Sequence, residues 1–166
     1  MKTLLKSIEW LIPFKIAYVL IFISMGCEDE VSVNCDGDRA QPVEQFYEDE
    51  YDVANCQFKN LEIKAGENNF VIKNQNDYEK FVTCNDDLPN IDFDKYFILA
   101  GVYQHHQCAT LVNQQILNCN GKINFNVKIE ETDCLVITEV TYLVVLERKY
   151  EKIPISYNIK IIINKS

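Results

Sequence analysis

Residues 114–130 read QQILNCNGKINFNVKIE, and this stretch decides the fold. The dipeptide Asn120-Gly121 is typical of a two-residue type I′ turn, because both positions of that turn need a positive φ. After the turn, polar residues alternate with four apolar ones: Ile123, Phe125, Val127 and Ile129. Such alternation predicts a strand with one buried and one solvated face. The sequence therefore predicts a β-hairpin centred on Asn120-Gly121.

Further strand patterns lie on both sides of this hairpin. The segments that we expect to form strands are 56–64, 69–73, 96–104, 110–118, 122–130, 134–147 and 155–163. The only good helix signal begins at Asn76, a candidate N-cap with Glu79 three residues later. Because the connections are short, neighbouring strands are expected to be antiparallel. The predicted fold class is α+β, a mostly antiparallel sheet of about six or seven strands with one short helix at about 77–84.

The N-terminus has the pattern of an export signal. Lys2, Lys6 and Lys15 precede an uncharged apolar run, IAYVLIFISM, over residues 16–25. At 1.5 Å per residue this run is roughly 15 Å long, about half of the bilayer core. A secretory signal peptide over residues 1–26 fits better than a membrane-spanning helix. Three endings compete: cleavage after small residues at Ser24 and Gly26, retention as an anchor, and lipidation at Cys27.

The residues Ser24-Met25-Gly26-Cys27 resemble the lipobox of bacterial lipoproteins. The acidic trio Glu28, Asp29 and Glu30 that follows resembles the export signal of lipoproteins displayed on the surface of some Gram-negative bacteria. The resemblance implies that Cys27 becomes the mature N-terminus and carries palmitate or similar acyl chains. It also implies that the protein is anchored to the outer membrane and exposed on the cell surface, with a periplasm-facing or secreted protein as the alternative. Two or more chains are needed for stable anchoring.

Six cysteines remain if Cys27 is lipidated. Their number is even and an exported chain meets an oxidising environment, so disulfide bonds are expected. None of them forms a Cys-x-x-Cys pair. A two-residue turn places residue 119 opposite 122 and therefore Cys108 opposite position 133, beside Cys134. We predict a Cys108–Cys134 disulfide, unless a bulge shifts the register. The six candidates are Cys35, Cys56, Cys84, Cys108, Cys119 and Cys134.

The mature chain divides by composition into a tether and a domain. Residues 27–52 hold ten acids and one base, Arg39, with few apolar residues. We expect a solvated spacer attached to the domain through Cys35. Residues 53–166 have the patterns of a single compact domain. The net charge of the chain, −9, argues against a nucleic-acid partner.

No residue pattern points to catalysis or to a bound cofactor. His105, His106 and Cys108 form the one metal-like cluster, but adjacent strand residues point to opposite faces and Cys108 is expected in a disulfide. The mature chain has few serines and no Gly-x-Ser-x-Gly elbow. Capping of turns explains the oxygen-rich stretch of Asp86, Asp87, Asn90, Asp92 and Asp94 without calcium. We predict no catalytic residue, no metal and no cofactor. Glu130, Glu131 and Asp133 are expected in a solvated turn.

The stretch from Phe70 to Ile163 resembles the C-terminal domain of PrcB-like protease-complex subunits and of related bacterial lipoproteins. The segments that carry the resemblance are FVIKNQNDYEKFV, LPNIDFDKYFILAG and ISYNIKIII. The family implies a non-catalytic binding partner or regulator of a protease, and no functional residue can be carried over from it. The six cysteines depart from its pattern.

These observations lead us to expect a membrane-anchored, extracytoplasmic lipoprotein that binds a protein partner and is not an enzyme. A protease or its substrate is the kind of partner that the resemblance implies. Binding through an edge strand needs backbone groups rather than special side chains. The alternative is a surface module that binds a glycan or a cation. Tyr142, Tyr150 and Tyr157 are the aromatic residues that such a module would offer, although strand alternation favours Tyr157 as a core residue.

Overall fold

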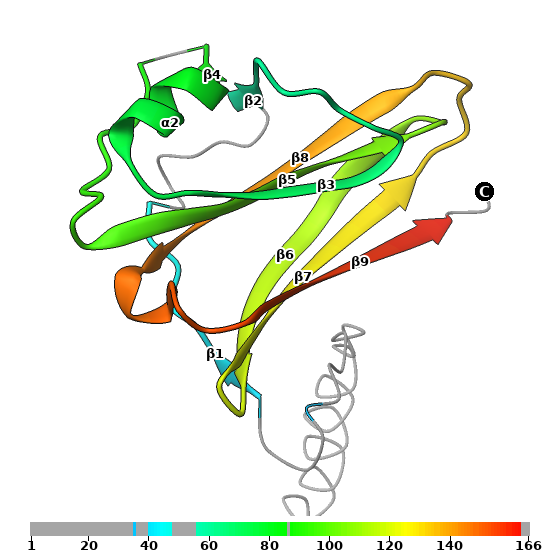
Figure 1. Ribbon diagram of the computed structural model, residues 1–166. Helices are drawn as coiled ribbons and strands as arrows, with labels where there is room; N and C mark the ends of the chain where they lie inside the picture. Colours follow the sequence, from blue (N-terminus) through cyan, green and yellow to red (C-terminus); the bar gives the residue numbers. More distant parts are fainter. Residues whose placement is uncertain (1–34, 36–39, 48–55, 86, 164–166) are drawn as a thin grey trace, which may run out of the picture. The chain divides into compact units, whose positions relative to one another are not determined.

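A computed structural model describes residues 35, 40–47, 56–85 and 87–163 (Figure 1). The described part is mostly β-structure with one short α-helix, so the predicted α+β class is confirmed. The elements in chain order are β1 (Gln41–Pro42), β2 (Cys56–Phe58), β3 (Gly66–Ile72), α2 (Gln75–Phe81), β4 (Val82–Cys84), β5 (Tyr96–His105), β6 (Ala109–Cys119), β7 (Lys122–Glu131), β8 (Thr138–Glu147), a 3-10 turn (Arg148–Tyr150) and β9 (Ile155–Ile163).

Two sheets pack face to face and enclose the main core. One has the strand order β1-β6-β7-β9 and the other the order β3-β5-β8, while β2 and β4 form a separate ribbon (Figure 1). The side chains of Phe97 and Leu99 on β5 meet those of Phe125 and Val127 on β7 in this core. Successive side chains of each strand point to opposite faces of its sheet, so one face of each sheet supplies this apolar layer.

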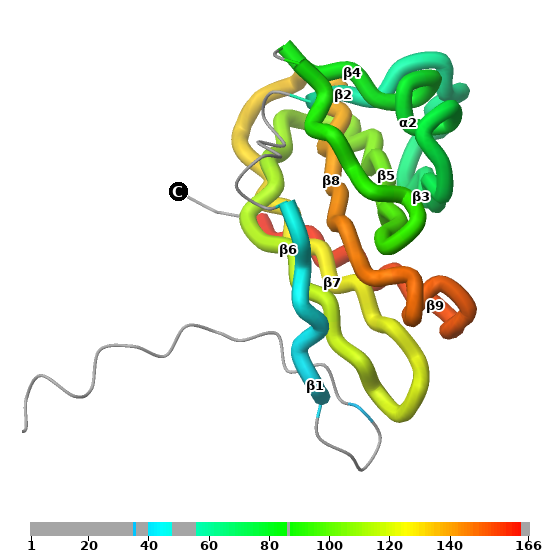
Figure 2. Tube along the Cα trace, turned by 90° about the vertical axis from the view of Figure 1, so that its left-hand side faces the viewer, coloured from blue at the N-terminus to red at the C-terminus, as the bar shows by residue number. Residues whose placement is uncertain are grey.

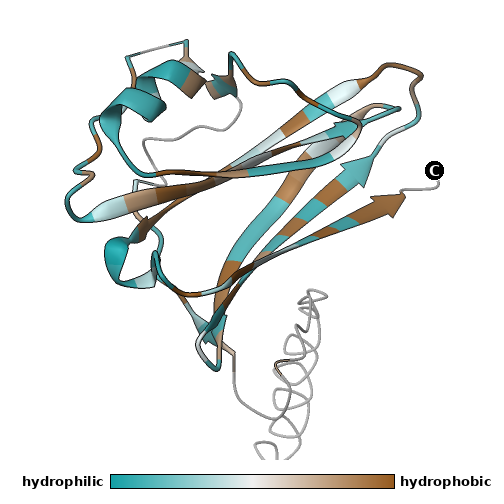
Figure 3. Cartoon of the chain, viewed as in Figure 1, coloured by the Kyte–Doolittle hydropathy of each residue, from teal (hydrophilic) through white to brown (hydrophobic). Residues whose placement is uncertain are grey.

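A second core covers the opposite face of the β3-β5-β8 sheet. Ile98 and Leu143 point to this side and pack with Tyr78 of α2 and Val82 of β4. Strands β5 and β8 are therefore covered on both faces, which explains their nearly continuous apolar sequences. Figure 3 shows these strands as mostly brown, whereas β7 and β9 alternate between brown and teal.

The β6–β7 hairpin has the predicted turn and, near the turn, the predicted register. Asn120 and Gly121 both have positive φ, and Cys119 lies opposite Lys122. A bulge then shifts the pairing by one residue between Leu111 and Asn113, so that Ala109 lies opposite Glu131. The predicted position opposite Cys108 was therefore wrong by one residue.

The described residues contain three disulfide bonds: Cys35–Cys119, Cys56–Cys84 and Cys108–Cys134. The last is the pair that the hairpin register singled out. Its two residues also share a backbone hydrogen bond, from the Cys108 N–H to the Cys134 carbonyl at 3.3 Å. The disulfide forms despite the bulge because Cys134 lies beyond the end of β7, in the connection to β8.

The last strand corrects the expectation of antiparallel neighbours. β9 pairs with β7 and runs parallel to it, with Phe125 opposite Tyr157. The short link from β8 to β9 crosses from one sheet to the other, so consecutive strands do not pair. β8 itself begins at Thr138 and not at Cys134, as the sequence had suggested.

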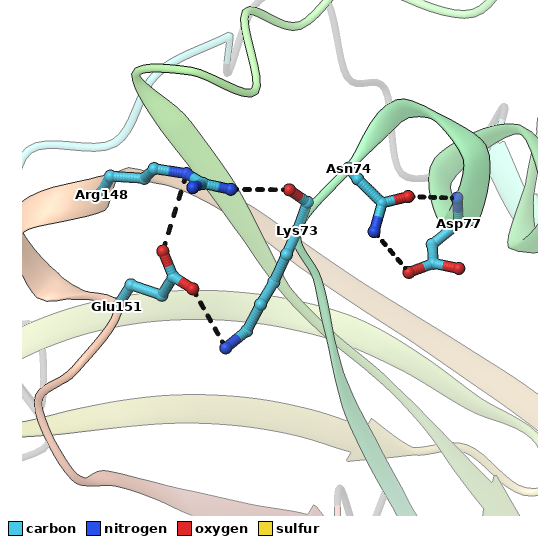
Figure 4. Close-up of polar contacts among 5 residues, drawn as sticks. All are labelled: Lys73, Asn74, Asp77, Arg148 and Glu151. Carbon is cyan, nitrogen blue, oxygen red and sulfur yellow. Dashed lines mark hydrogen bonds and ion pairs between the residues drawn. The ribbon is translucent and has the colours of Figure 1, made fainter.

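The helix cap was also predicted at the wrong residue. The N-cap is Asn74, whose Oδ1 accepts a hydrogen bond from the Asp77 N–H at 2.9 Å, while its Nδ2 donates to the Asp77 carboxylate (Figure 4). The helix therefore begins at Gln75 and ends at Phe81. Arg148, in the link between the sheets, donates to the Lys73 carbonyl at 2.8 Å and fixes the start of the helix to that link.

Residues 40–47, which we expected in the solvated tether, pack against the domain. Pro42 lies opposite Leu117 of β6, the Val43 N–H bonds to the Ile116 carbonyl, and the Val43 side chain is buried in the main core. Figure 2 shows this segment running alongside β6. The fold thus includes a strand-like segment that composition alone assigned to the spacer.

Candidate protein-binding groove

A pocket of about 310 Å³ lies between the edges of β6 and β8. Its walls come from three segments that are distant in sequence: residues 45–47, 111–114 and 143–145. Phe46, Leu111, Val112 and Leu143 give it an apolar lining, and Gln45, Asn113 and Gln114 add amide groups. We call this pocket, together with the neighbouring edge of β8, the β6–β8 groove.

The bulge in β6 forms one side of the groove. The extra residue, Val112, has no partner in the register between β6 and β7, and 47% of its surface is exposed. A bulge bends its strand and interrupts pairing. Here it places an apolar side chain at the rim of the groove.

The edge of β8 forms the other side. Among the described strands, β8 pairs only with β5. On its opposite edge, the Val145 carbonyl accepts a hydrogen bond from the Phe46 N–H at 3.1 Å. Phe46 packs on Tyr96 with ring centroids 4.8 Å apart, and the next residue, Tyr47, has a φ of 61°. This left-handed conformation departs from the extended backbone of a strand.

Next along this edge, the side chain of Gln114 bonds to the backbone of Leu143. The Nε2 of Gln114 donates to the Leu143 carbonyl at 2.9 Å, and its Oε1 accepts from the Leu143 N–H at 3.2 Å. One amide thus satisfies both backbone groups of Leu143. Within an antiparallel pair, these two bonds are the ones that a facing residue makes with its backbone.

Exposed apolar residues also occur in the connection between β7 and β8. Leu135, Val136 and Ile137 are 90%, 60% and 68% exposed. They directly precede β8, and the Cys108–Cys134 disulfide holds the base of their loop. Exposed apolar side chains such as these and Val112 are a feature of binding surfaces.

The charged residues of β5, β6 and β8 have one sign. Residues 96–121 and 130–147, which include all of β5, β6 and β8, contain no Lys or Arg. Their charged residues are Glu130, Glu131, Asp133, Glu139 and Glu147. The groove therefore lies in a region that favours a cationic or neutral partner.

The residues considered above as ligands for a metal or for calcium make contacts with other residues of the chain. His105 is 5% exposed and its Nε2 lies 2.7 Å from a Glu131 carboxylate oxygen, while Cys108 is in its disulfide. The Asp92 carboxylate pairs with Lys95 at 2.7 Å, and this contact lowers the pKa of Asp92. Within the described residues, no three His, Cys, Asp or Glu side chains gather as metal ligands would.

The tyrosines considered as a binding platform are core residues. Tyr142 is fully buried, and its hydroxyl donates to Asn69. Tyr157 and Tyr150 are partly buried against the main core. Burial raises the pKa of Tyr157 to about 12 and also raises the pKa of Tyr142. These side chains do not form an exposed aromatic surface.

The lipidation and export residues, Cys27, Glu28, Asp29 and Glu30, lie outside the described residues, as does Asp86. Sequence reasoning did not find the groove, because it depends on β6 and β8 meeting across two sheets. The available signals were the break in alternation at Leu111-Val112 and the apolar run at 135–137, which was assigned to a strand.

No protein-family model, curated protein or solved structure matches this chain. The resemblance to PrcB-like subunits therefore stays a prediction. Among the described helices, none is both long enough and apolar enough to cross a bilayer.

Proposed function

We propose that this protein is an extracytoplasmic lipoprotein, anchored through Cys27, whose domain binds another protein without catalysing a reaction. The domain recognises its partner at the β6–β8 groove. By the resemblance given above, a component of an envelope protease system is the partner class of first interest. The outer membrane is the proposed location, with the domain facing outward.

One observation carries this proposal: a groove lined by apolar and amide side chains lies beside a strand edge that has no second strand partner among the described residues. Strand edges and apolar rims are the features that recruit extended segments of other proteins. Gln114 bonds to both backbone groups of Leu143, and Phe46 bonds to the Val145 carbonyl, so the edge is ordered before a partner arrives.

Photo-crosslinking in the native envelope tests the proposal. The full chain carries benzoylphenylalanine in place of Val112, at the groove, or in place of Glu79, an exposed residue on α2. We expect a discrete protein adduct from position 112 and none from position 79. Equal adduct patterns from the two positions, or no adduct from position 112, would contradict the proposed binding site.

A glycan-binding surface is the second candidate, and one observation favours it. On the outer face of the β1-β6-β7-β9 sheet, Gln115, Asn126 and Asn158 lie side by side on three adjacent strands. Asn158 donates to the Asn126 Oδ1 at 3.0 Å, but the Asn126 Nδ2 is buried and has no hydrogen-bond partner among the described residues. Rotating the amide would only exchange the unpaired donor for an unpaired acceptor. A glycan-array signal lost in Asn158→Ala would favour this candidate over protein binding.

A further inference from the structure

We infer that the β6–β8 groove accepts an extended, basic and apolar segment of the partner as an added antiparallel strand on β8, and that the Gln114 side chain holds this strand position until the partner displaces it. This inference rests on the proposed protein-binding function and specifies its partner chemistry.

The backbone of β8 shows where the strand is added. The N–H and C=O of Leu143 both point away from β5, because both bond to Gln114. Backbone groups of residues two apart on a strand point to the same edge, so those of Thr141 and Glu139 point to the same edge of β8 as those of Leu143. No described residue donates a backbone bond to this edge at those two positions.

The chain itself begins the added strand at Phe46. This residue lies antiparallel to Val145 in an isolated bridge, and Tyr47, the last described residue of the segment, has a positive φ that a strand does not have. An extended partner segment that continues this line would meet Leu143, Thr141 and Glu139 in turn. The segment that adds here is therefore expected to be antiparallel to β8.

Gln114 imitates the residue that would face Leu143. Its Oε1 acceptor replaces the C=O that a facing residue would offer, at 3.2 Å, and its Nε2 donor replaces the N–H, at 2.9 Å. The groups of Leu143 stay satisfied while the position is vacant, which avoids the cost of a buried unpaired backbone. When a strand enters, the Gln114 amide is released to other partners.

The surroundings define the chemistry of the entering segment. The exposed side chains on β6 and in the connection before β8 include four apolar ones: Val112, Leu135, Val136 and Ile137. The charges on β5, β6, β8 and the connection before β8 are all acidic. An entering segment with apolar residues at alternate positions and Lys or Arg between them satisfies both features.

A synthetic peptide that alternates lysine and valine is the probe. Amide hydrogen exchange of the full chain, with and without this peptide, reports which backbone groups it covers. We expect protection of the Glu139 and Thr141 N–H groups, with no change at Val140, whose N–H points toward β5. A glutamate–valine peptide of the same length is expected to bind at least about tenfold more weakly. Equal binding of both peptides, or protection elsewhere than on β8, would overturn the inference.

Two N-methylated versions of the lysine–valine peptide separate strand addition from ordinary charge attraction. One version has N-methyl groups on every lysine and the other on every valine, and alternate N–H groups of a strand point to opposite edges. We expect one version to lose binding and the other to keep it. Equal binding of the two versions, whether both bind or neither binds, would exclude strand addition.

Three protein variants test the role of Gln114 and the place of the added strand. Gln114→Ala removes the competing amide, so the peptide is expected to bind about tenfold tighter. Thr141→Pro removes one outward N–H and is expected to weaken binding about tenfold, whereas Thr141→Val keeps the backbone and serves as its control. Weaker binding in Gln114→Ala would overturn the role assigned to this side chain.

The two proposals fail in different ways. If position 112 crosslinks to a native partner but the lysine–valine peptide protects nothing on β8, protein binding stands and strand addition is wrong. If the peptide protects Glu139 and Thr141 but no adduct forms in the envelope, strand addition stands and the proposed function is wrong.

Discussion

Gly101 lies beneath the ring of Tyr142, on the neighbouring strand. A Cβ added at Gly101 would overlap the Cε2, Cζ and hydroxyl oxygen of Tyr142, which is fully buried and bonded to Asn69. Gly101→Ala is therefore expected to lower the free energy of unfolding by about 1–3 kcal/mol through overpacking. Urea denaturation measures the change. In Gly101→Ala/Tyr142→Leu the overlapping atoms are gone, so the double variant should lose less than the sum of the single losses; additive losses would contradict this account.

Asn74 and Asn76 offer a matched pair at the start of α2. Asn74 bonds to the Asp77 N–H, whereas Asn76 is an exposed residue of the first turn. Asn74→Ala is expected to lower the free energy of unfolding by about 1 kcal/mol, and Asn76→Ala by less than about 0.5 kcal/mol. Thermal and urea denaturation of both variants provide the comparison. A larger loss in Asn76→Ala would place the cap where the sequence pattern had suggested it.

Two buried tyrosines predict a loss of stability in alkaline solution. Burial raises the pKa of Tyr157 from 10.0 to about 12, and the pKa of Tyr142 rises for the same reason. A raised pKa in the folded state means that unfolding releases protons above pH about 10. Stability is expected to be unaffected below pH 10 and to fall as the pH rises toward 12. Tyrosinate absorbance after a rapid pH jump reports whether the buried tyrosines ionise only on unfolding. At pH 12, Tyr157→Phe should retain a larger free energy of unfolding than the unmodified chain.

At the scale of elements, the loops closed by the disulfides differ in length. Cys35 and Cys119 are 84 residues apart, and Cys108 and Cys134 are 26 apart. In the chain-entropy model, replacing both cysteines of the longer loop by serine costs roughly 1 kcal/mol more than the same change in the shorter loop. The Cys35–Cys119 bond also fixes the segment that contains Val43. Urea denaturation of the two double-serine variants measures their free energies of unfolding. A larger loss in the Cys108/Cys134 variant than in the Cys35/Cys119 variant would contradict the prediction.

The elements that the sequence predicted well are those defined by local signals. Asn120-Gly121 determines the turn and the nearby register of β6 and β7, and the apolar alternation of β9 identifies its buried face. The bulge at Val112 and the parallel pairing of β9 were missed, because they depend on packing between sheets. The same applies to the groove. Gln114 is an ordinary polar residue in the sequence, and only the approach of β6 to Leu143 gives its amide a role.

At the scale of the whole molecule, the anchor and the groove make a combined prediction. The sequence places a single cysteine, Cys27, after the apolar run, and the other six cysteines pair within the domain and its N-terminal segment. Only Cys27 is then free to carry a lipid. Cys27→Ala is expected to abolish labelling by radioactive palmitate and to move the protein from the membrane to the soluble fraction, because the acyl chains supply the membrane affinity.

The double variant Cys35→Ser/Cys119→Ser is the matched control for the loss of a cysteine. It removes a structural disulfide but leaves Cys27, so it is expected to keep the palmitate label. Because the groove lies on the domain, Cys27→Ala should bind the lysine–valine peptide as tightly as the unmodified chain while losing its crosslinks in the envelope. An unlabelled wild-type chain, or a labelled Cys27→Ala variant, would contradict the proposed anchor. Crosslinks that persist in the soluble Cys27→Ala variant would show that the partner reaches the groove without help from the membrane.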